Sequence, residues 1–315
     1  MTDTVKQEVV QPLPRGWKAS DSPVKRAFAK SRLVQVACGT LLLIVLATIF
    51  APLLAWQNPF DPANLDLMDA FTAPWSQGMG EAFYPLGADD QGRDVFSAIL
   101  YGLRMSVFVG VSAVALSLII GVPLGLIAGY AGGWFDTLLM RIADIQLTFP
   151  VILVALLIFG IARGLLPEGY RDDMAVFVII VAIGLSDWVQ YARTVRGAVM
   201  VEKQKDYVLA AQLIGRSQTA ILTKHILPNL LAPILVIATI SFAHAIVAES
   251  TLSYLGVGLP PTSPSLGTLI RIGQGFLFSG EWWILLFPSL VLLALALSVN
   301  LVGDWLRDAL NPKLQ

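Results

Sequence analysis

The chain has 315 residues, of which 56% are hydrophobic and only 14% are charged, and its mean hydropathy is +0.71. An ordinary soluble domain carries about 25% charged residues, so this composition excludes a soluble globular protein. The net charge of −1 and the pI near 6.1 give no basic footprint for nucleic acid. The composition therefore predicts a protein that resides in a lipid bilayer.

Long apolar runs recur along the chain. A bilayer core of about 30 Å requires about 20 apolar residues per helix, whereas a barrel strand needs only about 9–11 alternating residues. The lengths of the runs therefore predict an all-α polytopic membrane protein with six transmembrane helices. The six predicted spans are Leu33–Ala55, Ser106–Tyr130, Leu138–Ala162, Ala175–Tyr191, Leu230–Tyr254 and Trp283–Val302.

The basic residues predict the orientation of these spans. A polar tail with seven Lys and Arg precedes the first span, so that span is expected to remain as an anchor with its tail in the cytoplasm. With six spans both termini lie inside, and sixteen of the 21 Lys and Arg then fall in cytoplasmic segments. The predicted organisation is a cytoplasmic tail at 1–32, a first transmembrane helix at 33–55, a periplasmic loop at 56–98, a five-helix core at 99–305 and a cytoplasmic tail at 306–315.

The segment 193–228 is a cytoplasmic insertion that is too polar to enter lipid. Apolar residues recur at roughly helical spacing between Asp206 and Ile214, Gly215 stands where a left-handed cap would end that helix, and Pro228 precedes the fifth span. A helix lying on the membrane surface would be expected to carry more aromatic anchors than Tyr207 alone. A docking helix for a soluble partner is therefore the favoured interpretation. Two small residues, Ala210 and Ala211, would allow a close approach.

Motifs for catalysis and for nucleotide binding are missing from the sequence. Cys38 is the single cysteine, His225 and His244 are not spaced as metal ligands, and no HExxH, G-x-S-x-G or Gly-Lys-Ser/Thr phosphate loop occurs. The chain is expected to be neither an enzyme nor the holder of a metal or cofactor. A partner subunit would have to supply any ATP hydrolysis.

Several charged residues and glycines fall inside the predicted spans. Arg141 and Asp144 lie three residues apart on one helix face and are expected to form a structural pair. Asp187 and Glu249 are isolated in the fourth and fifth spans, where an ionisable group lines a pathway or gate or else locks the bundle by hydrogen bonds. Close helix contacts are predicted by glycines that include spacings of four residues, namely Gly110, Gly121, Gly125 and Gly129. Pro123 can kink the second span.

The docking segment carries a family resemblance. Ala210-Ala211, then Gly215, then Leu227-Pro228 resemble the EAA loop of ABC importer permeases, whose coupling helix inserts into a cleft on the ATPase. Leu209 replaces the leading Glu, and His225 takes a position usually held by Ile. These departures resemble the dipeptide/oligopeptide/nickel branch of the family. Further segments that resemble this branch are Pro85-Leu-Gly-Ala-Asp89, Gln91-Gly-Arg-Asp94, Gly129 to Asp136, Arg141…Asp144…Pro150 and Ala248 to Gly258.

The resemblance implies a type I ABC importer transmembrane domain of the C-type, in the bacterial cytoplasmic (inner) membrane. Its implied partners are a homologous B-type permease, two ABC ATPase subunits that bind ATP and Mg, and an external substrate-binding protein. Di- or oligopeptides are the implied cargo, with nickel or another small solute as the alternative. An ion-coupled secondary transporter that uses Asp144, Asp187 or Glu249 remains an alternative of another class. The implied ATPase-coupling residues are Asp206, Tyr207, Ala210, Ala211, Gly215, His225 and Pro228.

Overall fold

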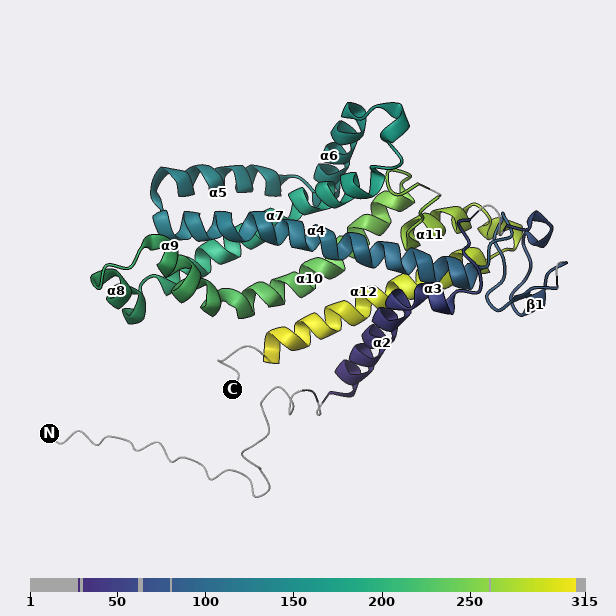
Figure 1. The fold of residues 1–315 in the computed structure, drawn as a ribbon, viewed down its shortest axis with the longest axis horizontal. Coiled ribbons are helices and arrows are strands. Elements are labelled where there is room, and N and C mark those ends of the chain that lie inside the picture. The colour runs from purple at the N-terminus through teal and green to yellow at the C-terminus, as the bar shows by residue number, and fades with distance from the viewer. Residues whose placement is uncertain (1–27, 29–30, 62–64, 80, 261, 310–315) are drawn as a thin grey trace, which may run out of the picture.

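A computed structural model describes residues 28, 31–61, 65–79, 81–260 and 262–309, so the predicted terminal tails lie largely outside the described residues. The described chain is a bundle of long helices with one small antiparallel hairpin (Figure 1). Its elements are α2 (Arg32–Ile49), α3 (Ala51–Leu54), η2 (Leu67–Asp69), β1 (Ser76–Gln77), β2 (Phe83–Tyr84), α4 (Val95–Ala131), α5 (Gly133–Thr148), α6 (Val151–Leu165), η3 (Glu168–Tyr170), α7 (Ala175–Glu202), α8 (Asp206–Leu213), α9 (Gln218–Ala220), the π-helical η4 (Ile221–Ile226), α10 (Leu227–Tyr254), α11 (Leu266–Gln274), η5 (Leu277–Ser279) and α12 (Trp283–Ala309).

The described helices confirm a polytopic membrane fold but correct the third span. Five helices are long and apolar enough to cross a membrane, and α5 with α6 make a sixth only as a pair bent by 99°. The bend lies at Pro150, which lacks an N–H and restricts Phe149 to an extended conformation with φ −95° and ψ 140°. The predicted span at 138–162 is therefore broken, and α6 turns sharply away from the direction of α5 (Figure 1) while it packs against α7.

The second and fourth spans are longer than the apolar runs that predicted them. Asp94 caps α4, because its side chain accepts hydrogen bonds from the backbone N–H groups of Phe96 and Ser97. Residues 95–98, which were assigned to the periplasmic loop, therefore form the first turn of α4. The fourth helix continues about three turns past Tyr191 to Glu202. Both extensions carry the membrane helices out to the two polar ends of the molecule.

A stripe of glycines joins α4 to α7, as their spacing predicted. Gly121, Gly125 and Gly129 share one face of α4, and an added Cβ at Gly125 would lie 2.5 Å from the carbonyl oxygen of Ala192. Equivalent clashes occur at the other two positions. The two backbones therefore approach too closely for any side chain larger than hydrogen. Pro123 lies within this stretch without interrupting α4, which continues to Ala131.

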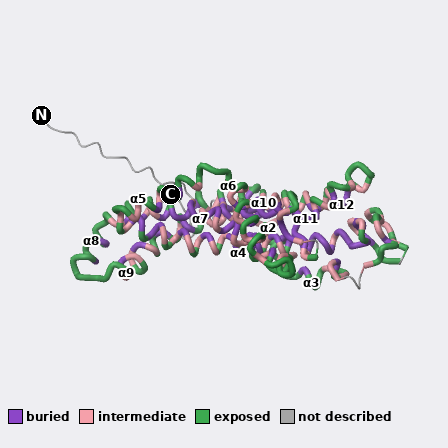
Figure 2. Tube along the Cα trace, turned by 90° about the horizontal axis from the view of Figure 1, so that it is seen from above, coloured by how far each residue is buried: buried purple, intermediate pink, exposed green. Residues whose placement is uncertain are grey.

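The two ends of the bundle differ in character. The helix α8 lies at one end and the β1–β2 hairpin at the other, α12 ends on the α8 side, and α2 runs from near the middle toward the hairpin side (Figure 1). This arrangement agrees with both termini lying on the cytoplasmic side. At the hairpin end, acidic residues are buried as structural groups, because Asp89 pairs with Arg93 at 2.6 Å and Tyr84 donates to Asp69 at 2.9 Å. At the opposite end α8 is largely exposed (Figure 2).

Candidate functional site

The cytoplasmic helix α8 ends as its sequence predicted. Gly215 adopts a left-handed conformation with φ +76°, its N–H donates to the Gln212 carbonyl at 3.0 Å, and the next N–H donates to the Ala211 carbonyl at 3.1 Å. These bonds satisfy carbonyl groups that the helix end would leave free, and glycine adopts this conformation at little cost. The cap turns the chain sharply back toward α9 and the bundle.

One face of α8 is buried against the bundle and the other is exposed. Val208 and Ala211 are buried and pack in a cluster that includes Leu126 of α4 and Val199 of α7. The opposite face carries large apolar side chains that touch little of this chain. Leu213 is 88% exposed and Ile214 is 74% exposed, and Leu209 is also exposed. A short helix that is anchored by small residues and presents large ones outward is a surface suited to a protein partner.

A tyrosine ties α8 to the two long helices on either side of it in sequence. The Tyr207 hydroxyl donates to the carboxylate of Glu202, the last residue of α7. It also accepts a 2.8 Å hydrogen bond from the Asn229 amide in the first turn of α10. Burial and the neighbouring Glu202 raise the pKa of Tyr207 above its usual value, so the phenol remains protonated at neutral pH. We call Glu202, Tyr207 and Asn229 the strap.

Further polar contacts fix the cytoplasmic end of α7. Lys205 pairs with Glu202 at 2.8 Å, and the Lys203 ammonium donates to the Gly129 carbonyl at the end of α4 at 2.8 Å. Arg196 binds both carboxylate oxygens of Asp136 in α5, with one N–H···O contact of 2.7 Å. Sequence patterns missed the roles of Lys203 and Arg196, since their contacts join different helices, whereas Lys205 and Glu202 are only three residues apart. Only the charge of the segment hinted at them.

Pro228 does not separate α8 from the fifth span as a break would. The helix α9, the π-helical η4 and α10 run together from Gln218 to Tyr254. Pro228 falls in the first turn of α10, where the missing N–H costs little because η4 shifts the hydrogen-bond register ahead of it. The His225 carbonyl, inside η4, accepts from Asn229 at 3.0 Å. The start of α10, the fifth spanning helix, is thus joined directly to the segment that contains α8.

The remaining predicted coupling residues separate into two groups. Asp206 is exposed in the first turn of α8, where a negative charge suits the helix dipole. Ala210 faces outward, whereas Ala211 is buried against this chain. Ala211 therefore packs within this chain, and of the two alanines only Ala210 is exposed for contact with a partner.

The predicted pair of Arg141 and Asp144 is corrected by the structure. Asp144 instead lies 3.7 Å from the guanidinium of Arg193 on α7, and no ion pair joins it to Arg141 within the described chain. The helix α5 runs back along the bundle beside α7, which brings Arg193 across to Asp144 (Figure 1). Both side chains are about half exposed, so the pair contributes little to stability.

Glu249 is enclosed rather than exposed to a pathway. It is fully buried and accepts hydrogen bonds from Ser106 at 2.9 Å and from Ser253 at 2.7 Å. Ser106 belongs to α4, and its hydroxyl oxygen also accepts from the Leu266 N–H of α11 at 3.2 Å. We call this group the Glu249 knot, and it locks α4, α10 and α11 together.

Asp187 lies in a second polar group, between α7 and α10. It is 5% exposed, and His244 of α10 is near enough to interact with it electrostatically. Tyr191 and Ser241 are also buried in this group, between the same two helices. His244 is exposed and is the outward member of this group. The structure therefore distinguishes Asp187, which is close to a surface residue, from the enclosed Glu249.

The apolar spanning helices define a polytopic membrane protein, and the exposed apolar face of α8 is a surface suited to a protein partner. The family model for the binding-protein-dependent transport system inner membrane component matches residues 121–315. That for the N-terminal TM domain of oligopeptide transport permease C matches residues 23–74. The chain belongs to the family of binding-protein-dependent transport system inner membrane components, and is a transport component rather than a catalytic one.

Curated relatives match nearly the whole chain. The dipeptide transport system permease protein DppC of Haemophilus influenzae is 38% identical over 91% of this chain and 93% of its own length. The di/tripeptide transport system permease protein DppC of Pseudomonas aeruginosa is 37% identical, over 93% of each chain. The oligopeptide transport system permease protein OppC of Bacillus subtilis is 38% identical over 91% of this chain and 88% of its own.

Solved structures extend the comparison to the fold. A chain of the MetNI methionine ABC transporter in an inward-facing conformation aligns with a TM-score of 0.51 and 18% identity, over 67% of this chain and 94% of its own. The likeness supports the type I importer fold. The predicted fold class is thereby confirmed.

Proposed function

We propose that this chain is the permease subunit of an ATP-driven importer of di- or oligopeptides that works with a substrate-binding protein. The outward face of α8 carries the coupling part of the proposal. Leu209, Leu213 and Ile214 are exposed on a helix whose other face is anchored. Relatives that cover nearly the whole chain are named as dipeptide and oligopeptide permeases, which supports a peptide cargo.

In this proposal α8 moves with the ATPase that covers it. The strap transmits the displacement, because Tyr207 is bonded to Glu202 at the end of α7 and to Asn229 at the start of α10. Each of these helices continues without interruption from the cytoplasmic end into the membrane. A displacement of α8 would therefore tilt both spans together. Such a switch requires two discrete arrangements that the ATPase and the substrate bias differently.

The remaining subunits follow from what the chain lacks. ATP and Mg would be bound by two separate ABC ATPases, and the translocation cavity would be completed by a homologous B-type permease. The helix α6 supports a permease partner, because one side of it packs against α7 while another side exposes an apolar stripe. The stripe is formed by Leu153, Leu157, Ile161 and Leu165.

The substrate route is proposed to follow one face of α10. His244, Thr251 and Tyr254 recur on one side of this helix and are at least partly exposed. Polar groups within a span face a water-filled cavity or another protein rather than lipid. Asp187, which lies behind His244, would keep this part of the route polar. Glu249 is proposed to act as a structural lock instead.

Reconstitution of the complete transporter tests the proposal. Proteoliposomes that contain both permeases, the ATPases and the binding protein should transport a labelled dipeptide only when ATP is present on the side of the membrane that carries the ATPase subunits. Uptake that is driven by an ion gradient without ATP would contradict the ABC reading and favour a secondary transporter. ATP-dependent uptake of nickel without any uptake of peptide would contradict the cargo alone.

A further inference from the structure

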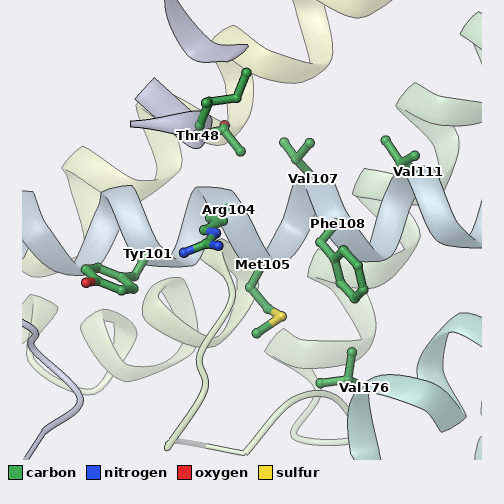
Figure 3. Close-up of a pocket in the computed structure, with 9 residues that line it drawn as sticks. Thr48, Tyr101, Arg104, Met105, Val107, Phe108, Val111 and Val176 are labelled. Atoms are coloured by element: carbon green, nitrogen blue, oxygen red, sulfur yellow. The ribbon is translucent and has the colours of Figure 1, made fainter. Parts of the chain in front are cut away.

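A pocket of about 830 Å³ lies outside the proposed substrate route, between α2, α4 and α7 (Figure 3). Its walls are Thr48 and Ile49 of α2, Val176 of α7, and one face of α4 from Tyr101 to Val111. The pocket is open to the surroundings of the bundle rather than enclosed. It therefore offers a site to a ligand that arrives from the side of the protein.

The residues that line the pocket show how deep it lies in the membrane. Thr48 and Ile49 are the last residues of α2, and Val176 is the second residue of α7. In the N-in orientation, α2 ends and α7 begins on the external side. The pocket is thus level with the external boundary between membrane and water. Arg104 lies about 14 Å along α4 from its external start at Val95, at a rise of about 1.5 Å per residue.

The pocket is polar toward the outside and apolar toward the membrane centre. Tyr101 and Arg104 lie on the external part of the α4 face, and Val107, Phe108 and Val111 follow deeper (Figure 3). Within the described chain, Arg104 forms no ion pair and the Tyr101 hydroxyl makes no hydrogen bond. An arginine and a tyrosine at this level are suited to lipid head groups.

The apolar part of the wall continues down α4. Phe108, Val111, Ile119 and Ile127 all expose more than two fifths of their surface. This stripe offers no polar group to a peptide in transit, in contrast with the His244 side of α10. It matches the acyl chain of a lipid in both chemistry and direction. The guanidinium provides several donors in a fixed fork for a phosphate group.

We propose that this pocket binds one phospholipid of the outer leaflet of the membrane. Arg104 and Tyr101 hold the phosphate, and one acyl chain lies along Val107, Phe108 and Val111. The lipid fills the space between the end of α2 and the core, and so fastens this first span to the other helices. The site depends on the membrane orientation of the chain and not on the identity of its cargo.

Native mass spectrometry of the complete transporter tests the proposal, with phosphatidylglycerol as the added probe. Wild type should retain a phospholipid through delipidation and Arg104→Gln should lose it, with apparent affinity falling by about tenfold or more, which corresponds to about 1.4 kcal/mol. Arg163→Gln is the matched control, because Arg163 is also an external arginine but pairs with Asp172 at 3.4 Å. It should retain the lipid.

A second pair of variants keeps the test independent of assembly defects at Arg104. Val111→Trp should displace the acyl chain while Arg104 remains, and Tyr101→Phe should weaken lipid binding with little disturbance of the fold. Equal retention of the lipid in wild type, Arg104→Gln and Val111→Trp would overturn the proposal. Displacement of the lipid by excess dipeptide would also overturn it, because the pocket would then belong to the substrate route.

Discussion

The helical core and the docking helix α8 are built on opposite principles. In the core, α4 and α7 meet at glycines that leave no room for a methyl group, and the Glu249 knot is completely enclosed. At α8, two small side chains are buried and the large apolar ones face outward. The core is therefore closely packed within this chain, whereas α8 presents an apolar surface that is suited to another protein. The strap is the connection between them.

The exposed apolar side chains at the end of α8 could contribute burial free energy to the binding of a partner. Burying a leucine or isoleucine side chain contributes about 1.5–3 kcal/mol. Leu213 and Ile214 gain almost none of this within the chain, since both are mostly exposed. Their contribution is available only on association. The same residues in the core would instead have stabilised the isolated subunit.

A charge on the outward face of α8 should have the largest effect on transport. Leu213→Asp is expected to leave the fold intact, because the side chain is 88% exposed. It should reduce dipeptide uptake and peptide-stimulated ATP hydrolysis by about tenfold or more, since an unpaired carboxylate would be buried at the docking surface. Thr219→Asp, at an exposed position on α9, is the control. Normal uptake by Leu213→Asp would remove the contrast between α8 and the core.

Cutting the Glu249 knot should destabilise the core strongly. Glu249→Ala leaves the buried hydroxyls of Ser106 and Ser253 without their acceptor, at a cost of about 1–3 kcal/mol for each unsatisfied group. The measurement is the thermal unfolding midpoint in detergent. Glu249→Gln retains one acceptor oxygen and should lose less. Equal stability of the alanine variant and wild type would mean that the knot does not hold the core.

A single methyl group should test the closeness of α4 and α7. Gly125→Ala places a Cβ 2.5 Å from the Ala192 carbonyl oxygen and is expected to lower the unfolding free energy by about 1–3 kcal/mol. Gly197→Ala is the matched control, because a Cβ there meets nothing within 4 Å. The control should be neutral or stabilising by up to about 1 kcal/mol, as alanine favours helix. Identical unfolding of the two variants would refute a tight seam.

Loosening the strap should have the smallest effect. Tyr207→Phe removes the hydrogen bonds to Glu202 and Asn229, which contribute about 0.5–1.5 kcal/mol each. We expect ATP hydrolysis to continue while the number of peptides transported per ATP falls. Tyr170→Phe, at an exposed external tyrosine, should change neither quantity. An unchanged ratio in Tyr207→Phe would show that the strap does not transmit motion.

The sequence predicted the features that depend on composition and local backbone chemistry. Hydropathy identified the spanning segments, the glycine spacing predicted close helix contacts without naming the partner helix, and Gly215 identified the end of α8. It failed at Pro150, where a long apolar run concealed a sharp bend. Hydropathy measures a preference for lipid and does not respond to a single missing N–H. At Pro228 the sequence predicted a boundary before the fifth span, but the helix continues through this proline from Gln218 to Tyr254, with a π-helical turn just ahead of it.

The polar contacts of the candidate site could be predicted only in part. The spacing of Arg141 and Asp144 suggested a local pair, but α7 brought Arg193 to the same carboxylate. Tyr207 was singled out by its motif, whereas its partners Glu202 and Asn229 come from other helices. Such contacts depend on how helices cross. A single sequence contains no direct signal for that geometry.

Cross-linking from α8 tests the central claim most directly. Cys38 is the single native cysteine, so Leu213→Cys in a Cys38→Ser background carries one thiol on the outward face. In the complete transporter a short thiol-reactive cross-linker should join this residue to an ATPase subunit, and Val208→Cys on the buried face should give no product. Equal cross-linking from both positions, or none from Leu213→Cys in an active transporter, would contradict the account.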